Sequence, residues 1–245
     1  MNLPNSLTIG RIAATPAITA LIMNPPWQYR LSAWLLFLAA AITDYYDGKL
    51  ARSRNLVTRT GKLLDPIADK ALLIATLVPI YWLTRDVPLL GQVPGDARWA
   101  AGVVGPVALG TPEHNAYPFI TPLGLVPTPL WVVALIIGRE LFMTFLRQHA
   151  ARRGVVISAI GPAKLKTTFQ NIWVGTAFFW FFAASAAAQN AWTNSAWVAF
   201  AHFNGIVGTI GMLAALGLTL YSLWIYLQRY GGLLLPGRRP ATPPS

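Results

Sequence analysis

The chain of 245 residues is 55% hydrophobic and 11% charged, and its 19 Lys and Arg outnumber its 8 Asp and Glu. A mean hydropathy of +0.49 is typical of an integral membrane protein and excludes an ordinary soluble domain. Cysteine is absent, which excludes disulfides, thiolate catalysis and Cys-ligated zinc.

Six apolar segments predict six transmembrane helices, because each approaches the ~20 residues of a bilayer span once its flanks are added. The segments are Thr8 to Met23, Leu31 to Thr43, Ala71 to Thr84, Pro129 to Thr144, Asn171 to Ala188 and His202 to Leu227. We therefore expect an all-α integral membrane protein. The opening residues, Asn2 to Arg11, are expected as a juxtamembrane segment on the inner surface, without a cleaved signal peptide.

The basic residues are distributed unevenly over the ends of these segments. If the N-terminus is cytoplasmic and the helices alternate, 16 of the 19 Lys and Arg fall on the inner side, and only Arg30, Arg85 and Arg98 fall outside. The positive-inside rule then places both termini at the cytoplasmic face of an inner membrane. Anionic lipid headgroups suit this basic surface, so we expect no nucleic-acid partner.

Four of the eight acidic residues lie between the second and third apolar segments, at Asp44, Asp47, Asp65 and Asp69. The first two are three residues apart and the last two are four apart, so each pair is expected on one helix face. A short turn between them brings the pairs to the same membrane depth. Carboxylates at a membrane edge require cations. Oxygen ligands without Cys or nearby His favour Mg²⁺, with Mn²⁺ as the alternative, and four carboxylates suffice for two ions.

Other interpretations of this acidic cluster remain open. Membrane carboxylates also form ion sites in cation-coupled transporters, although those usually lie near the bilayer midplane. Asp44 and Asp47 can also simply neutralise Lys49 and Arg52, which leaves the second pair unexplained. Aspartate-rich membrane prenyltransferases likewise use Mg²⁺ and diphosphates.

Small residues share the faces of the acidic pairs. Gly48 and Ala51 leave room beside the carboxylates for a bulky ligand, and so does Gly61. Arg52 offers a forked donor for phosphate oxygens. This combination predicts a diphosphate site.

Two further parts of the chain are an external connection and a tail. Residues 85–128 are rich in Pro and Gly and are expected as an extended external connection, in which Trp99 to Leu109 can form a short interfacial or re-entrant helix. The Pro-rich residues 231–245 are expected to be a disordered cytoplasmic tail. Residues 1–230 then form one membrane-embedded catalytic domain.

Charged residues in and just after the fourth segment, and just before the fifth, predict a pocket for a phosphorylated second substrate. Its cationic donors are Arg139, Arg147, Lys164 and Lys166. Thr167 and Gln170 follow on the same helix, and Glu140 is expected to pair with a neighbouring Arg or Lys. Lys164 and Lys166 can alternatively serve only membrane topology.

The acidic segment resembles the full signature of the CDP-alcohol phosphatidyltransferases. The matching pattern is Asp44-x-x-Asp47-Gly48-x-x-Ala51-Arg52, eight residues, then Gly61-x-x-x-Asp65-x-x-x-Asp69. This resemblance implies six transmembrane helices, a homodimer and transfer of a phosphatidyl group from a CDP-linked lipid to an alcohol with release of CMP.

The resemblance also implies roles for individual residues. Asp44, Asp47 and Asp65 would hold two metal ions, and Asp69 would share one of them and act as general base. The residues implied to bind the CDP-lipid are Gly48, Ala51, Arg52, Thr58 and Gly61.

The opening Asn2 to Arg11 and the stretches around Arg139 and Lys164 are similar to the phosphatidylglycerophosphate-forming branch of the family. This similarity implies CDP-diacylglycerol as donor and sn-glycerol 3-phosphate as acceptor. Inositol phosphate remains open as the acceptor, because it also carries a phosphate. The chain departs from the branch in its long external connection and in Pro162.

Overall fold

The computed structural model describes residues 3–53, 59–85, 119–122, 124–158, 161–190, 192 and 194–234. Within these ranges the chain forms α1 (Leu3–Met23), α2 (Trp27–Ser53), α3 (Arg59–Thr84), α4 (Leu130–Arg152), α5 (Gly161–Gln189), α6 (Ser195–Tyr230) and the 3-10 helix η2 (Gly231–Leu234). Two short strands, β1 (Ile120–Thr121) and β2 (Gly124–Leu125), pair antiparallel.

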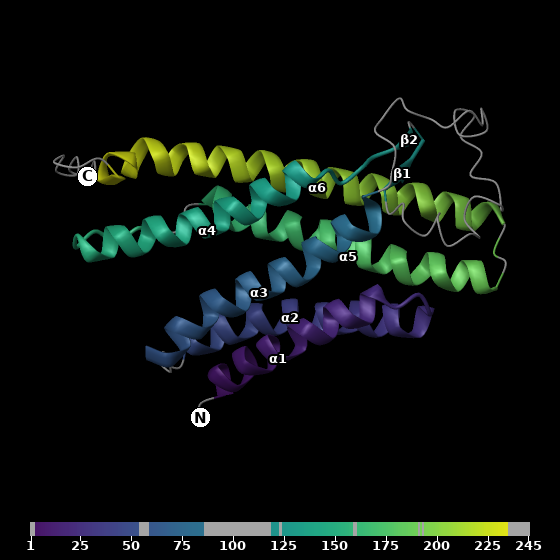
Figure 1. Ribbon diagram of the computed structural model, residues 1–245, viewed down its shortest axis with the longest axis horizontal. Helices are drawn as coiled ribbons and strands as arrows, with labels where there is room; N and C mark the ends of the chain where they lie inside the picture. Colours follow the sequence, from purple (N-terminus) through teal and green to yellow (C-terminus); the bar gives the residue numbers. More distant parts are fainter. Residues whose placement is uncertain are drawn as a thin grey trace.

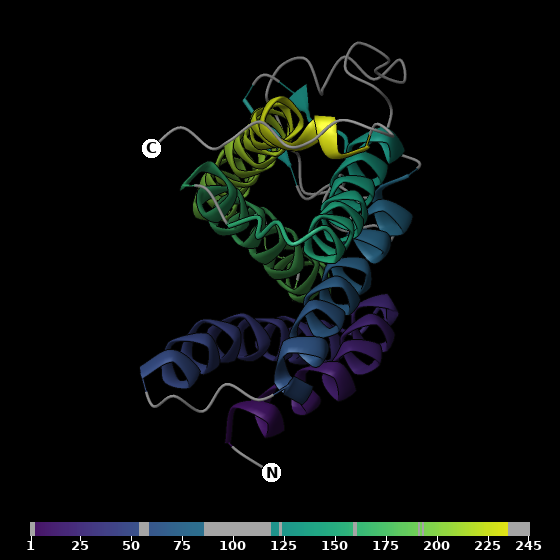
Figure 2. The same cartoon turned by 90° about the vertical axis from the view of Figure 1, so that its left-hand side faces the viewer.

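The helices form two groups along the chain, α1 to α3 and α4 to α6 (Figure 1). In the first group, α2 and α3 each pack along α1, whereas few described residues of α2 and α3 contact one another directly. Helix α5 packs along α6 and also against α2, which joins the two groups. Both termini lie at the same end of the molecule (Figure 1), and the turned view shows α1 and α6 on opposite sides (Figure 2).

Within the described ranges, four helical stretches are long and apolar enough to cross a membrane. They are Asn5–Met23, Leu64–Thr84, Gly161–Gln189 and Ser195–Leu233. Helices α2 and α4 are equally long but carry charged residues that include Asp44, Arg139 and Glu140. The multi-pass membrane class is therefore supported by four helices, and the count of six spans stays a prediction.

Aromatic side chains of α5 fill the centre of the core, where Trp173, Phe178, Trp180 and Phe181 are fully buried. Helix α6 approaches α5 closely at Gly211, where a Cβ would lie 3.1 Å from the backbone nitrogen of Trp173. Small residues allow such close contact between membrane helices. The α5–α6 pair thereby forms a rigid support for the residues at the start of α5.

The external connection differs from its prediction where it is described. Residues 119–122 and 124–128 contain the β1–β2 hairpin, which the all-α expectation had missed. Phe119 and Ile120 are buried against α6, where a Cβ at Gly205 would lie 1.8 Å from the Ile120 carbonyl oxygen. This stretch is part of the core because two glycines, Gly205 and Gly208, open the helix surface to it. The predicted helix from Trp99 to Leu109 lies outside the described residues.

The two ends of the chain also differ from expectation. The opening residues form the first turns of α1, which is one continuous helix from Leu3. The tail was expected to begin at 231, yet Gly231–Leu234 form η2 and Leu233 is buried under α4. His149 and the Arg153 guanidinium contact the Leu233 carbonyl, which explains this order. Residues 235–245 lie outside the described part.

Candidate active site

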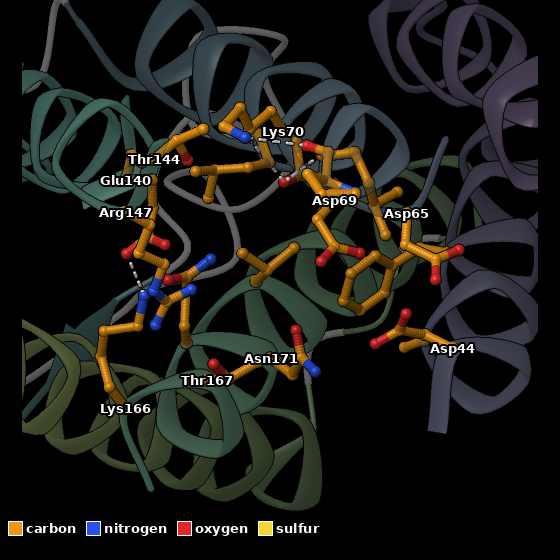
Figure 3. A pocket seen from close by; sticks show the side chains of 18 residues that line it. Asp44, Asp65, Asp69, Lys70, Glu140, Thr144, Arg147, Lys166, Thr167 and Asn171 are labelled. Carbon is orange, nitrogen blue, oxygen red and sulfur yellow. Dashed lines mark hydrogen bonds and ion pairs between the residues drawn. The ribbon is translucent and has the colours of Figure 1, made fainter. Parts of the chain in front are cut away.

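A cavity of about 260 Å³ lies among α2, α3, α4 and α5. One side carries Asp44, Asp65 and Asp69, and the other carries Glu140, Arg147 and Lys166 (Figure 3). Thr167 and Asn171 of α5 lie between the two sides (Figure 3). Glu140 lies near the middle of α4, whereas Asp44 and Arg147 lie in the later halves of α2 and α4. The acidic residues of α3 and the polar residues of α5 lie in the earlier halves of those helices, so the cavity lies toward the end of the molecule where α1 begins and α6 ends.

The acidic side brings together carboxylates from two helices. Asp44 extends from α2, and Asp65 and Asp69 extend from one face of α3, as their spacing of four predicts. The side chains of Asp44 and Asp69 are 48% and 60% exposed, so their oxygens are accessible from the cavity. Three like charges on one wall repel one another unless cations lie near.

Helix α1 supplies polar partners to all three carboxylates. Thr8 Oγ1 donates to Asp65 Oδ1 at 2.9 Å. Arg11 Nη1 lies 2.5 Å from Asp44 Oδ1 and 3.4 Å from Asp69 Oδ1. Neither Arg11 nor Thr8 was predicted at the site from the sequence. The available signal was their spacing of three residues on an apolar helix, which places a hydroxyl and a cation on one face.

Carboxylate oxygens are the ligands that hard divalent cations prefer, and these carboxylates lie on the same wall of the cavity. Among the described side chains, no group of three or more His, Cys, Asp or Glu is already arranged to hold a metal ion. Asp47 lies on α2, but its side chain is outside the described part. The metal site of four carboxylates therefore stays a prediction. It is supported by three of the four, which lie on one wall of the cavity.

The residues predicted to bind the CDP-lipid are described only in part. Gly48, Ala51 and Arg52 lie on the last turns of α2, with side chains outside the described part. Thr58 is outside the described residues altogether. Gly61 is buried in the first turn of α3, four residues before Asp65. Their roles stay predictions.

On the basic side, Glu140 lies between two cations. Its Oε1 accepts a hydrogen bond from Arg139 Nη1 at 2.7 Å and another from Lys166 Nζ. Arg139 also donates to Ser222 Oγ on α6 at 3.0 Å. The predicted pairing of Glu140 with neighbouring Arg and Lys residues is thus confirmed, and the three charges join α4 to α5 and α6.

The four cations predicted for the acceptor pocket have different positions. Arg147 and Lys166 line the cavity, whereas Arg139 is buried behind Glu140. Lys164 is exposed and lies outside the cavity lining. Arg147 is exposed and has no hydrogen-bond or ion-pair partner among the described residues. It is therefore the lining cation with the most capacity to bind an anion.

Several neutral side chains complete the lining. Thr167 and Gln170 were predicted there, and both line the cavity. Thr144 of α4 and Asn171 of α5 were not predicted. Asn171 follows Thr167 by four residues and Thr144 precedes Arg147 by three, so the helical spacing could have identified both.

The CDP-alcohol phosphatidyltransferase family model matches residues 1–227 of the chain. The chain belongs to this family. The match includes the whole acidic segment and both sides of the cavity, so the resemblance inferred from the motif is confirmed.

Two relatives are about a third identical to the chain over the stretches that align. A CDP-diacylglycerol–glycerol-3-phosphate 3-phosphatidyltransferase 2 of Arabidopsis thaliana is 33% identical over 178 residues, which are 70% of this chain and 62% of the relative. A cardiolipin synthase (CMP-forming) of Oryza sativa subsp. japonica is 31% identical over 243 residues, 96% of this chain and 59% of the relative.

A bacterial relative is more similar over a shorter stretch. The CDP-diacylglycerol–glycerol-3-phosphate 3-phosphatidyltransferase of Rickettsia bellii is 54% identical over 87 residues, which are 35% of this chain and 47% of the relative. The chain spans less than two thirds of the length of each of these three relatives.

Proposed function

We propose that this chain is an enzyme of phospholipid synthesis that transfers the phosphatidyl group of CDP-diacylglycerol to sn-glycerol 3-phosphate. The products are phosphatidylglycerophosphate and CMP. The observation that carries the proposal is one cavity with carboxylates on one wall and cations on the other. A diphosphate held through cations and an acceptor that carries its own phosphate require these two opposite surfaces.

The acidic side is the proposed metal site. Asp44, Asp47, Asp65 and Asp69 would hold two Mg²⁺ ions, with Mn²⁺ as the alternative, because all four ligands offer carboxylate oxygen. When bound, these ions neutralise the diphosphate and stabilise the departing CMP.

Asp69 is the proposed general base. Its side chain is 60% exposed and lines the cavity, so its carboxylate is within reach of an acceptor hydroxyl there and can accept the proton of that hydroxyl. The acceptor oxygen then forms a bond to the lipid-side phosphorus while the bond from phosphorus to the CMP oxygen breaks. The proton passes from Asp69 to solvent.

The basic side is the proposed acceptor site. Arg147 provides an unpaired guanidinium, and Lys166 provides the hydrogen-bond donors that Glu140 leaves free. Arg139 acts from behind, since it holds Glu140 in place. We assign Lys164 a weaker role, as a charge near the entrance that attracts the anionic acceptor.

The donor nucleotide is proposed to lie at the end of α2. Gly48, Ala51 and Gly61 leave space there, and Arg52 and Thr58 provide donors to phosphate oxygens. The cavity lies toward the end of the molecule that holds both termini. Together with the positive-inside bias, this position supports a site facing the cytoplasm in an inner membrane. We further propose a homodimer, as the family resemblance implies.

Transfer to phosphatidylglycerol is the second candidate function. The rice relative named cardiolipin synthase (CMP-forming) aligns with 96% of this chain, which favours this reaction. Its acceptor has a phosphodiester with one negative charge, so it needs fewer cations than a phosphate monoester. The free Arg147 beside Lys166 favours the monoester.

The deciding experiment measures CMP release by the purified protein from CDP-diacylglycerol and Mg²⁺. Separate reactions contain glycerol 3-phosphate, phosphatidylglycerol, inositol phosphate, or no acceptor. Release that depends on glycerol 3-phosphate supports the proposal. Release only with phosphatidylglycerol selects the second candidate, and release only with inositol phosphate selects the other phosphorylated acceptor. A folded protein without release in any reaction contradicts the transferase and favours cation-coupled transport.

A further inference from the structure

We propose that Arg11 and Thr8 of α1 are positioning residues that set the metal affinity of the acidic side. This inference rests on the metal site of the proposed function. It assigns a role to a helix of which no described side chain lines the cavity. The proposal concerns how the carboxylates are held, since neither residue touches the reacting atoms.

The packing of the helices gives α1 this role. Asp44 is on α2, and Asp65 and Asp69 are on α3, but few described residues of α2 and α3 contact one another directly. Both helices pack along α1 instead. The distance between the carboxylates of the two helices therefore depends on what α1 places between them.

The contacts of α1 reach each carboxylate. One nitrogen of Arg11, Nη1, contacts Oδ1 of Asp44 and Oδ1 of Asp69, which lie on different helices. Thr8, one turn earlier, donates to Asp65. A single cation thus joins the two helices of the cluster and offsets part of the repulsion between their charges.

Burial shows from which side Arg11 acts. Its side chain is 1% exposed, whereas those of Asp44 and Asp69 are 48% and 60% exposed. Thr8 is likewise 2% exposed. The guanidinium and the hydroxyl therefore lie behind the carboxylates, and oxygens of the carboxylates stay accessible from the cavity. Outer partners that orient metal-binding carboxylates typically change metal affinity by about 10- to 100-fold when they are removed.

The test is equilibrium binding of Mn²⁺ to the purified full chain in nanodiscs, followed by the electron paramagnetic resonance of free Mn²⁺ and without substrate. Arg11→Lys keeps the positive charge, but the lysine side chain is shorter, so its ammonium stops short of the position from which Nη1 contacts both carboxylates. We expect its Kd for Mn²⁺ to rise about tenfold or more. Thr8→Val removes the hydrogen bond from the Thr8 hydroxyl to the Asp65 carboxylate at nearly constant volume, and we expect the Kd for Mn²⁺ to rise by at most about tenfold.

Arg30→Lys is the matched control. Arg30 is also a buried arginine, 6% exposed. It lies in the first turn of α2, and its Nη1 donates to Ser185 Oγ on α5 at 2.6 Å. We expect both Arg11→Lys and Arg30→Lys to lower the apparent Tm. Arg30→Lys should leave the Kd for Mn²⁺ unchanged. A loss of affinity in both variants would mean that any buried arginine acts through stability, which overturns the proposal.

Other outcomes overturn the proposal separately. Unchanged Mn²⁺ affinity in Arg11→Lys removes the positioning role. Tighter binding in that variant would mean that the guanidinium competes with the cation for the carboxylates. Wild-type protein that binds no Mn²⁺ contradicts this inference and the metal site together. In that case, CMP release by the same sample is measured with glycerol 3-phosphate. Release would show that the proposed transfer still holds although the metal site and this inference do not.

Discussion

The two sides of the cavity arrange their charges in opposite ways. On the acidic side, a buried cation, Arg11, lies between carboxylates that are about half exposed. On the basic side, a carboxylate, Glu140, lies between two cations, and the side chains of Arg139 and Lys166 are each only 5% exposed. Glu140 itself is 26% exposed.

This difference determines which charged side chains are available to bind a ligand. The acidic side directs its carboxylates to the cavity and keeps its neutralising cation behind them. The basic side neutralises most of its own cations internally, and Arg147 is the exposed exception. Removing a charge should therefore affect chemistry on the acidic side, and stability or acceptor binding on the basic side.

Asp69→Asn should produce the largest effect, because it removes the proposed general base. We expect CMP release to fall about 10²- to 10⁴-fold, while CDP-diacylglycerol still binds. The measurement compares turnover with donor binding at several Mg²⁺ concentrations. Asp44→Asn is the matched variant, and its loss of turnover should be partly restored by high Mg²⁺. Turnover by Asp69→Asn comparable to wild type would contradict the assignment of the base.

Glu140→Gln should mainly destabilise the fold, because it leaves Arg139 and Lys166 buried without a counter-charge. We expect a loss of about 3 kcal/mol, near the low end for breaking a buried pair because Glu140 is partly exposed. For a chain of this size the apparent Tm should fall by about 6–12 °C. Thermal unfolding in detergent checks this, and an unchanged Tm would show that the pairing contributes nothing to stability.

Arg147→Gln should weaken acceptor binding with a smaller effect on the chemical step. A charge-assisted hydrogen bond contributes about 1.5–3 kcal/mol, which corresponds to a rise in the KM for glycerol 3-phosphate of about 10- to 100-fold. The KM for CDP-diacylglycerol should stay the same. The structure places Arg147 at the cavity without a described partner, so the Tm should change little. A lower kcat with an unchanged KM would place the acceptor phosphate elsewhere.

Lys164→Gln should have the smallest effect and serves as the control for Arg147→Gln. It removes the same unit of charge from an exposed residue outside the cavity lining. We expect the KM for glycerol 3-phosphate to rise less than about twofold at physiological salt, where such exposed charges are screened. An effect as large as that of Arg147→Gln would mean that overall charge, rather than position, determines acceptor binding.

The sequence alone determined the class of the protein and the acidic half of the site. Hydropathy predicted membrane helices, and four of them are long and apolar enough to cross a membrane. The fixed spacing of the signature residues from Asp44 to Asp69 identified the family, because local helical geometry and ligand chemistry depend on residues close together in the chain. The pairing of Glu140 could likewise be predicted from its charged neighbours.

Only the tertiary structure decided which charges face the cavity. Arg11 and Asp69 are 58 residues apart, and Arg139 and Ser222 are 83 apart. No spacing rule connects such residues, because their contact depends on how whole helices pack. For the same reason the sequence treated Arg139, Arg147, Lys164 and Lys166 as equals. The contacts that α4 makes with Lys166 of α5 and Ser222 of α6 place Arg139 and Lys166, both buried, beside Glu140, whereas Arg147 stays exposed in the cavity wall.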